Sequence, residues 1–404
     1  MNRLAVWMYG SMMGLLSRSR GALVFEYSQE ALEGGVGRPL LSVSMPTRSR
    51  PYRGEVPRAF FDGLLPEGEA RRLIAYDFGV DERDVLGLLA AIGRDCAGAL
   101  VIIPEGEPLA AGGLPEPMTD AQVADRLRDL RFAPLGVDQR VRVSLAGMQE
   151  KLLLSAVGGG WGLPVDGAPS THIVKPAHPL FADSIANEAL CMNAARHLGI
   201  LAARVETRRF DGIPALVIER YDRSPTDGRQ PVLRVHQEDL CQAHALDPQR
   251  KYEQRGGPSL RRCAQTIQLW ARGSGELERL LDIVTLNVLV GNADAHAKNI
   301  SLLHAVGGQV RLAPAYDVMA TLHYPGVSTI PGMFVNGAQD IGGIRRDDLV
   351  GEAVSWGLPH DVAAARIGRV LAGAEDAIRA AADETQPPDD LLRSLFERAR
   401  LLAE

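Results

Sequence analysis

The sequence has few cysteines and lacks a long apolar segment. Its 404 residues include four cysteines, Cys96, Cys191, Cys241 and Cys263, and none of them forms a CxxC pair. This usage is more typical of free thiols in a reducing cytoplasm than of a disulfide framework. No stretch has the length and apolarity of a membrane span, and a Ser-Arg-Ser-Arg tract instead of a small-residue cleavage site follows the apolar start. We therefore expect a cytoplasmic protein without a membrane partner.

The sequence also lacks an excess of basic residues. Its formal net charge is −6, which argues against broad, non-specific binding of nucleic acid. A short basic segment at 249–255 is more typical of a solvated face than of a nucleic-acid site. Hydrophobic residues make up 46% of the chain, which is enough to bury a large core divided among two or three folding units.

Composition divides the chain into three predicted parts. Residues 1–135 are expected to form a β-rich subdomain, and residues 140–225 a second unit of strands with one helix. Residues 226–404 are predicted to be mostly helical, with alanine- or leucine-rich helices at 363–382 and 390–403. The sequence thus predicts an α+β fold.

The main functional signal follows the apolar run at 280–290. Asp294 is followed five positions later by Asn299, and Asp317 lies beyond two short apolar runs. Protein kinases place a catalytic base and two magnesium ligands in this order. Phosphoryl transfer depends on orienting the acceptor hydroxyl and neutralising phosphate charge, so a base and hard oxygen ligands are the residue types required. We predict that Asp294 is the base and that Asn299 and Asp317 bind Mg²⁺.

The segment between the two predicted metal ligands supports this interpretation. Apolar runs at 300–304 and 310–313 flank a Gly-Gly turn, a pattern that predicts a β-hairpin returning Asp317 to the neighbourhood of Asn299. A single Asp or Asn here would more safely be interpreted as a cap or turn residue, but the spacing of all three favours a phosphoryl-transfer site. His296 has no second His or Cys at zinc-ligand spacing, so a transition-metal site is not expected.

A kinase also needs a loop that covers the phosphates and a lysine after it. Residues 144–151 are small enough to let backbone amides approach phosphates, but they lack the GxGxxG pattern and by themselves favour a plain turn. A strand predicted at 171–175 ends in Lys175, which either contacts the α- and β-phosphates or is an exposed lysine at a strand end. Glu188, on a helix predicted at 187–199, either pairs with Lys175 or is solvated.

A strand predicted at 215–223 occupies the position of a kinase hinge, and the whole series of motifs resembles the HipA family of serine/threonine-kinase toxins from bacterial toxin–antitoxin modules. The resemblance rests on motifs in the family's order: Leu64–Gly68, Gly93–Leu100, SLAGMQEK from Ser144, THIVKP from Thr171, IERYDR from Ile218, RVHQEDLCQ from Arg234, Lys251-Tyr252, GNADAHAKN from Gly291, and AYD from Ala315. It implies a protein-kinase-like two-lobed fold with an extra β-rich N-terminal subdomain, a nucleotide-binding lobe at 140–225 and a mostly helical C-terminal lobe.

The resemblance also implies roles for individual residues. The base falls on Asp294, and the metal ligands fall on Asn299 and Asp317. The implied nucleotide contacts are Ala146, Gly147, Met148, Gln149, Glu150, Lys151, Lys175, Glu219, Arg220, Tyr221, His296, Ala297, Lys298, Asn299, Tyr316 and Asp317. Ser144 is implied to be autophosphorylated, and the added negative charge would repel the phosphates of the nucleotide.

The sequence therefore predicts a kinase toxin that uses ATP and Mg²⁺. By resemblance it would bind a helix-turn-helix antitoxin that holds operator DNA, and it would phosphorylate a translation component such as an aminoacyl-tRNA synthetase. Two alternatives stay open: a small-molecule or lipid kinase, because such enzymes share DxHxxN loops, and a nucleotide-binding corepressor scaffold without kinase activity. The N-terminal unit and the SLAGMQEK loop disfavour the first, and the intact Asp294, Asn299, Asp317 and Lys175 weigh against the second.

Overall fold

The computed structural model describes residues 3–109, 113–224, 232–273 and 275–404. The chain forms two compact units, each assembled from separate segments. The first unit contains residues 1–176, 208–248 and 303–308, and the second contains residues 177–207, 249–302 and 309–404. The three-part division expected from composition stays a prediction, and its second boundary lies outside the described residues.

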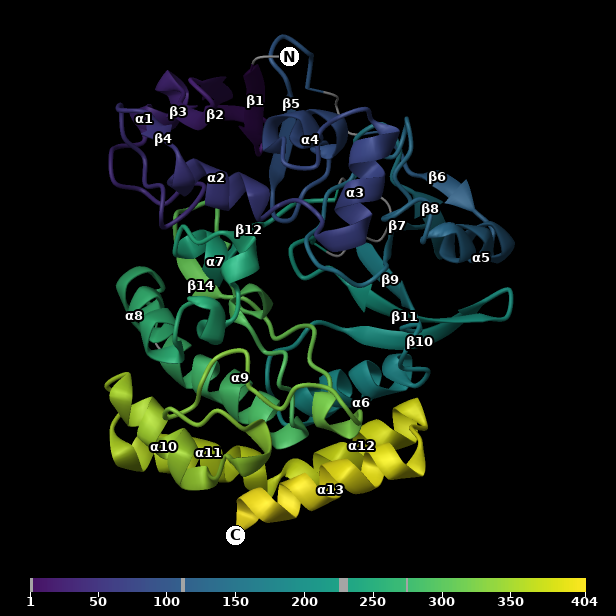
Figure 1. Cartoon of the computed structure of the whole chain (residues 1–404), viewed down its shortest axis with the longest axis vertical. Coiled ribbons are helices and arrows are strands. Elements are labelled where there is room, and N and C mark those ends of the chain that lie inside the picture. Colours follow the sequence, from purple (N-terminus) through teal and green to yellow (C-terminus); the bar gives the residue numbers. More distant parts are fainter. Residues whose placement is uncertain (1–2, 110–112, 225–231, 274) are drawn as a thin grey trace. The chain divides into compact units, whose positions relative to one another are not determined.

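The first unit begins with a five-stranded sheet in the order β4-β3-β2-β1-β5 (Figure 1). Its strands are β1 (Arg3–Met8), β2 (Ser11–Ser19), β3 (Ala22–Tyr27), β4 (Tyr52–Arg53) and β5 (Leu100–Pro104). The helices of this part are α1 (Gln29–Glu33), α2 (Glu55–Asp62), α3 (Gly68–Asp77) and α4 (Val85–Ile92). Buried aromatic rings join sheet to helix, since Phe25 of β3 and Phe61 of α2 have ring centroids 5.5 Å apart.

A six-stranded sheet has the order β10-β11-β9-β7-β8-β6. Its strands are β6 (Glu116–Met118), β7 (Leu152–Val157), β8 (Gly160–Leu163), β9 (His172–Pro176), β10 (Val205–Phe210) and β11 (Ile213–Glu219), and α5 (Asp120–Asp129) follows β6. β9 pairs antiparallel with both β7 and β11, so Lys175 lies on an interior strand, opposite Leu216. A third sheet has the order β12-β13-β14, and its strands are β12 (His236–Asp239), β13 (Ser301–His304) and β14 (Val310–Leu312).

Four antiparallel strand pairs are joined by two-residue turns in which both residues have positive φ. The turns are Tyr9-Gly10, Arg20-Gly21, Gly158-Gly159 and Asp211-Gly212. Positive φ at both positions defines the type I′ turn, whose twist matches that of the flanking strands. Glycine occupies the second position of each of these turns, where it adopts the left-handed backbone without a steric cost, so the turns favour the register of the hairpins.

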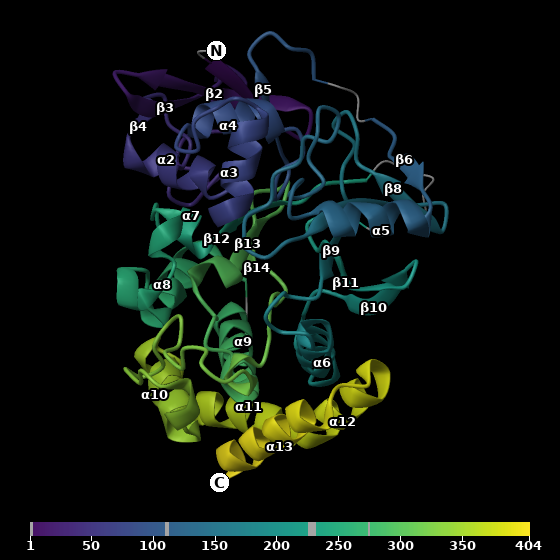
Figure 2. The same cartoon turned by 45° about the vertical axis from the view of Figure 1, so that its right-hand side comes forward.

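The second unit is mostly helical. Its helices are α6 (Ser184–His197), α8 (Leu260–Trp270), α9 (Glu276–Val290), α10 (Arg346–Ser355), α11 (His360–Ala372), α12 (Ala374–Thr385) and α13 (Asp389–Ala403). Every residue of α9 from Leu280 to Val290 is buried, and α8, α11 and α13 pack around this helix. α13 buries an apolar stripe at helical spacing and lies beside α11 and α12 in both views (Figures 1 and 2). The short α7 (Leu240–Ala243) belongs to the first unit.

Several predicted elements are confirmed, and two need correction. The strand at 171–175, the helices at 187–199 and 390–403, and the hairpin at 300–313 are present as β9, α6, α13 and β13-β14. The strand predicted at 215–223 ends at Glu219, because the following residues turn into a buried network of ion pairs. The helix predicted at 363–382 is wrong as a single element, because Gly373 ends α11 and begins α12.

No helix among the residues described here is both long and apolar enough to cross a membrane.

Candidate active site

The loop that carries Asp294 starts at the C-terminus of α9. Gly291 caps this helix with a φ of +71°, the left-handed conformation in which glycine avoids a steric penalty. A Cβ at this position would lie 2.9 Å from Leu322 Cδ1. Both the backbone conformation and the close contact with Leu322 therefore favour glycine.

The next two residues fasten the loop on both sides. Asn292 is buried, and its side-chain amide donates to Asn287 Oδ1 of α9 at 2.7 Å. The Ala293 N–H donates to Thr321 Oγ1 at 2.8 Å, and the Ala293 carbonyl accepts from the Gly332 N–H at 2.8 Å. The backbone that presents Asp294 is thus held by α9 and by the segment around Thr321 and Gly332.

The Asp294 side chain is exposed, as an acceptor-binding carboxylate must be. Tyr252 Oη donates to Asp294 Oδ1 at 2.6 Å. The Asp294 carbonyl accepts from Asn299 Nδ2 at 3.1 Å and from the His296 N–H at 2.8 Å. An exposed carboxylate with a fixed backbone can orient a substrate hydroxyl and accept its proton.

The β13-β14 hairpin brings the surroundings of Asn299 and Asp317 together. Tyr316 Oη donates to the Lys298 carbonyl at 2.6 Å and lies 2.7 Å from Ser301 Oγ. Tyr316 precedes Asp317 and Lys298 precedes Asn299, so these contacts join the immediate neighbours of the two predicted metal ligands. The juxtaposition expected from the hairpin pattern is present.

The exposed Asp317 has a φ of +57°, in the left-handed region, which aspartate enters more readily than most residues with a side chain. Mg²⁺ prefers oxygen ligands and takes only one or two from protein when phosphates and water complete its shell. The carboxylate of Asp317 and the amide oxygen of Asn299 form a donor set of this kind, and their role as ligands stays a prediction.

The other predicted nucleotide contacts of this loop are buried. His296, Ala297 and Lys298 are all buried, and the Ala297 N–H donates to the Lys251 carbonyl at 3.1 Å. The His296 ring meets the Tyr252 ring edge to face, with centroids 5.0 Å apart. These contacts fix the loop, and a nucleotide contact by its residues stays a prediction.

The predicted phosphate loop belongs to the first unit and contains neither helix nor strand. Gly147 has a φ of +113°, and a Cβ there would lie 2.6 Å from Lys151 Nζ. Lys151 is buried and donates from Nζ to the Ala146 carbonyl at 3.0 Å. The lysine amine therefore folds back under a loop whose tip, Met148, is exposed, while Gln149 and Glu150 are half-buried.

Ser144 begins this loop and is fully buried. Its Oγ donates to the Leu64 carbonyl at 2.7 Å, and its N–H donates to the Asp95 carbonyl at 2.9 Å. The hydroxyl is thus enclosed by protein in this conformation. Phosphorylation of Ser144 therefore requires the loop to move away from Leu64 and Asp95.

The predicted lysine and hinge residues also lie in the first unit. Lys175 is buried on β9, and Glu219 ends the neighbouring β11 opposite His172. The Arg220 N–H donates to the Thr171 carbonyl at 2.9 Å, and Tyr221 Oη donates to Gln237 Oε1. Glu188, the predicted partner of Lys175, is buried on α6 in the second unit, and no observation tests that pair.

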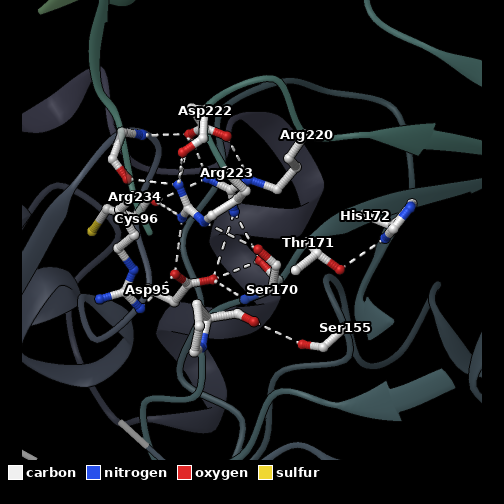
Figure 3. Close-up of polar contacts among 12 residues, drawn as sticks. Asp95, Cys96, Ser155, Ser170, Thr171, His172, Arg220, Asp222, Arg223 and Arg234 are labelled. Atoms are coloured by element: carbon white, nitrogen blue, oxygen red, sulfur yellow. Dashed lines mark hydrogen bonds and ion pairs between the residues drawn. The ribbon is translucent and has the colours of Figure 1, made fainter. Parts of the chain in front are cut away.

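A buried network of charges fixes the end of the hinge strand (Figure 3). Arg220 Nη2 donates to Asp222 Oδ2 at 2.7 Å, and Arg223 Nη2 donates to Asp95 Oδ1 at 3.0 Å. Arg234 also reaches Asp95 Oδ1, at 2.9 Å. In Figure 3 the two carboxylates lie on opposite sides of the guanidinium groups of Arg220 and Arg223. Three arginines against two aspartates leave a net charge of +1.

The network keeps its carboxylates ionised. Burial raises the pKa of the Asp95 carboxyl, but the guanidinium groups of Arg223, Arg234 and Arg220 together lower it well below its usual range. The Ser170 hydroxyl adds a hydrogen bond to Asp95 Oδ2 at 2.6 Å. Burial and repulsion by Arg220 lower the pKa of Arg223 to about 10, so the guanidinium stays charged at neutral pH.

Sequence reasoning missed residues that join the site from a distance. Tyr252, Thr321 and Gly332 contact the Asp294 loop, and Asp95 holds the backbone of Ser144. Tyr252 and Asp95 stand in motifs that carried the family resemblance, but their partners are far away in the sequence. The motifs indicated that Tyr252 and Asp95 belong to the family pattern, but they did not indicate which residues these two contact.

The fold is α+β, with mixed sheets and helices and a lysine on an interior strand. One loop and hairpin carry an Asp, an Asn and a second Asp, the order expected of a kinase-like protein. Residues 4–103 match the family model of the HipA N-terminal domain, and residues 143–378 match that of the HipA-like C-terminal domain. The chain therefore belongs to the HipA family, as the motifs predicted.

Individual relatives agree with this assignment. The Sinorhizobium fredii protein Y4mE, named as a kinase, is 40% identical over 333 residues, which are 80% of this chain and 79% of the relative. The serine/threonine-protein kinase toxin HipA of Shewanella oneidensis is 30% identical over 323 residues, 77% of this chain and 74% of that protein. A solved structure from the Shewanella oneidensis MR-1 toxin–antitoxin system, with HipA, HipB and operator DNA, matches with a TM-score of 0.83 at 26% identity and covers 99% of this chain and 96% of that one.

Proposed function

We propose that this chain is an MgATP-dependent protein serine/threonine kinase that acts as the toxin of a toxin–antitoxin system. The observation that carries the proposal is the arrangement of Asp294, Asn299 and Asp317, which all lie in the second unit, on one anchored loop and at the base of one hairpin. Membership in a family whose relatives are named as kinases supports it.

The proposed chemistry assigns each residue one task. Asp294 orients the acceptor hydroxyl and takes its proton as the hydroxyl oxygen bonds to the γ-phosphorus of ATP and the bond to the β–γ bridging oxygen breaks, leaving ADP. Asn299 and Asp317 would hold Mg²⁺, which neutralises charge on the β- and γ-phosphates. Lys175 and the loop from Ala146 to Lys151 would contact the phosphates, and the end of β11 would meet the adenine.

We further propose that Ser144 is the autophosphorylated residue. Its hydroxyl is enclosed against the Leu64 carbonyl, so a phosphate there would be buried and would face a carbonyl oxygen. The modified loop could not return to its position against the Leu64 carbonyl. Phosphorylation would therefore remove a phosphate-binding loop from the site and silence the enzyme.

The proposed partners follow from the relatives. The solved structure from Shewanella oneidensis contains HipA, HipB and operator DNA, and we propose that this chain also binds a helix-turn-helix antitoxin and contacts operator DNA within that complex. The proposed substrate is a translation component such as an aminoacyl-tRNA synthetase, and the proposed compartment is the cytoplasm, where free buried thiols such as Cys96 and Cys191 stay reduced.

Transfer of labelled γ-phosphate from ATP in the presence of Mg²⁺ tests the proposal. We expect the wild type to label itself and one or more proteins of a host lysate, and Asp294→Asn to label neither. Ser144→Ala should lose self-labelling but keep labelling of the lysate protein. Transfer to a metabolite instead of a protein would indicate a small-molecule kinase. ATP binding without any transfer would indicate a nucleotide-binding scaffold.

A further inference from the structure

The segment around Tyr252 is built into the candidate active site. The basic stretch at 249–255 was expected to be a solvated face, but Lys251 within it is buried and its carbonyl accepts from the Ala297 N–H at 3.1 Å. The Tyr252 carbonyl accepts from the N–H groups of Arg255 and Gly257, both at 2.9 Å. The backbone of Tyr252 is therefore tied to the Asp294 loop on one side and to a tight turn on the other.

A second set of contacts ties this segment to the stretch after Asp317. The Glu253 N–H donates to the Gly332 carbonyl at 2.8 Å, and Glu253 Oε2 accepts from the Phe334 N–H at 2.7 Å. Gly332 in turn donates to the Ala293 carbonyl. A Cβ on Gly332 would lie 2.7 Å from the Ala295 carbonyl oxygen, so these three segments pack at backbone contact. Tyr252 thus has little freedom to move independently of Asp294.

The Tyr252 ring is held on several sides. The His296 ring meets it edge to face, with centroids 5.0 Å apart. The Arg255 guanidinium and the Lys251 ammonium lie 5.3 Å and 5.7 Å from its centroid, within the range of cation–π attraction. These contacts orient the phenol so that its hydroxyl donates to Asp294 Oδ1 at 2.6 Å.

We propose that Tyr252 is a positioning residue for the base of the phosphoryl-transfer reaction. An exposed aspartate can rotate about its side-chain torsions, and a short hydrogen bond from a fixed phenol removes that freedom. With Oδ1 held by Tyr252, the orientation in which the carboxylate meets the acceptor hydroxyl is fixed.

This inference rests on the proposed function, since it gives Tyr252 a role only if Asp294 acts as base. It goes beyond that function because it adds a residue distant in sequence that sets the orientation of the base. A purely structural role for the ring would be served equally well by phenylalanine, because the contacts with His296, Arg255 and Lys251 use the ring and not the hydroxyl.

Tyr252→Phe tests the inference, because it removes the hydroxyl and keeps the ring. We expect kcat for phosphate transfer to fall between about 10- and 100-fold, the loss typical of a hydrogen bond to a charged group, while KM for ATP stays the same. The midpoint of urea denaturation should not change, because the ring keeps its contacts with His296, Arg255 and Lys251. Tyr52→Phe is the matched control, because Tyr52 Oη donates to the Pro46 carbonyl in the first unit, and it should leave kcat and KM as in the wild type.

The outcomes separate the inference from the proposed function. If the wild type transfers phosphate, Asp294→Asn does not, and Tyr252→Phe keeps the wild-type kcat, the inference is overturned and the proposed function stands. A fall in kcat together with a raised KM for ATP and a lowered denaturation midpoint would assign Tyr252 a structural role and would also overturn the inference. If the wild type and Asp294→Asn are equally inactive, the proposed function fails and the role of Tyr252 fails with it.

Discussion

At the scale of single residues, the Asp95 carboxylate shows how a buried charge is tolerated. Its exposed surface is zero, and it is bound by Arg223, Arg234 and Ser170. Removing one charge of such a network leaves the others buried without compensation, a larger loss than the network's own net contribution to stability. The Asp95 carbonyl also holds the Ser144 N–H, so the network adjoins the proposed phosphate loop.

Asp95→Asn is expected to lower the free energy of unfolding by about 3–5 kcal/mol, the cost typical of breaking a buried ion pair. The net charge of the network would rise from +1 to +2, because three arginines would face Asp222 alone. Chemical denaturation followed by tryptophan fluorescence measures the change. Asp166→Asn is the control, since Asp166 is exposed and lies 3.7 Å from Arg140, and its loss should cost less than about 0.5 kcal/mol. Equal effects of the two substitutions would contradict this account of the network.

His236 gives stability a dependence on pH. Burial, followed by repulsion from His304, lowers the pKa of its imidazole to about 3, and its Nε2 lies 2.8 Å from the Leu41 carbonyl. Below the ordinary value of about 6.5 the unfolded chain binds a proton that the folded chain refuses, so the stability present at neutral pH is lost as pH falls from there toward 3. Burial lowers the pKa of His172 to about 4, which acts in the same direction.

We therefore expect the free energy of unfolding to decline between pH 7 and pH 5, with His236 contributing at most about 1.4 kcal/mol per pH unit. His236→Asn should be less stable at pH 7.5 but should show a shallower decline toward pH 5. Urea denaturation at several pH values measures both slopes. A variant slope equal to that of the wild type would show that His236 is not the titrating group.

At the scale of elements, the end of α9 positions the Asp294 loop. Gly291 combines a left-handed backbone with a contact against Leu322, whereas Gly337 has a similar φ of +79° with nothing near its missing side chain. Gly337→Ala should cost about 1–2 kcal/mol for backbone strain alone. Gly291→Ala should cost more and should also lower phosphate transfer, because Leu322 and the loop must shift. Thermal unfolding and a transfer assay compare the two variants, and equal activity in both would contradict the proposed role of Gly291.

The elements also show which parts of the fold the sequence could predict. Local patterns predicted β9, α6 and the β13-β14 hairpin, because strand and helix periodicity and a Gly-Gly turn act over a few residues. The single helix predicted at 363–382 was wrong, since its composition favours helix throughout and does not reveal that the chain bends at Gly373. The strand predicted at 215–223 was too long, because Arg220, Asp222 and Arg223 are bound by residues far away in the sequence.

The candidate site divides in the same way. Asp294, Asn299 and Asp317 could be grouped from sequence because a single loop and hairpin connect them. Tyr252, whose hydroxyl binds Asp294, is separated from it by 42 positions, and no local pattern records that contact. The enclosure of Ser144 by Leu64 and Asp95 is likewise a tertiary feature, which a resemblance can suggest only as a role and not as a geometry.

At the scale of the whole molecule, the two family models match both the N-terminal part of the chain and the part that carries the candidate site. They match residues 4–103 and 143–378, which include the N-terminal motifs as well as the Asp294 loop. Belonging to the family gives the proposed kinase activity its strongest support outside the site itself.

The central claim is that Asp294 acts as a base while Asp317 and Asn299 bind Mg²⁺. ATP affinity measured with and without Mg²⁺ tests this claim most directly. Titration of labelled ATP into the wild type, Asp294→Asn and Asp317→Asn is the measurement. We predict that Mg²⁺ strengthens ATP binding to the wild type and to Asp294→Asn alike, although Asp294→Asn transfers no phosphate, and that Asp317→Asn loses the Mg²⁺-dependent part. If Asp294→Asn and Asp317→Asn respond identically to Mg²⁺, or if Mg²⁺ leaves ATP binding to the wild type unchanged, the account is contradicted.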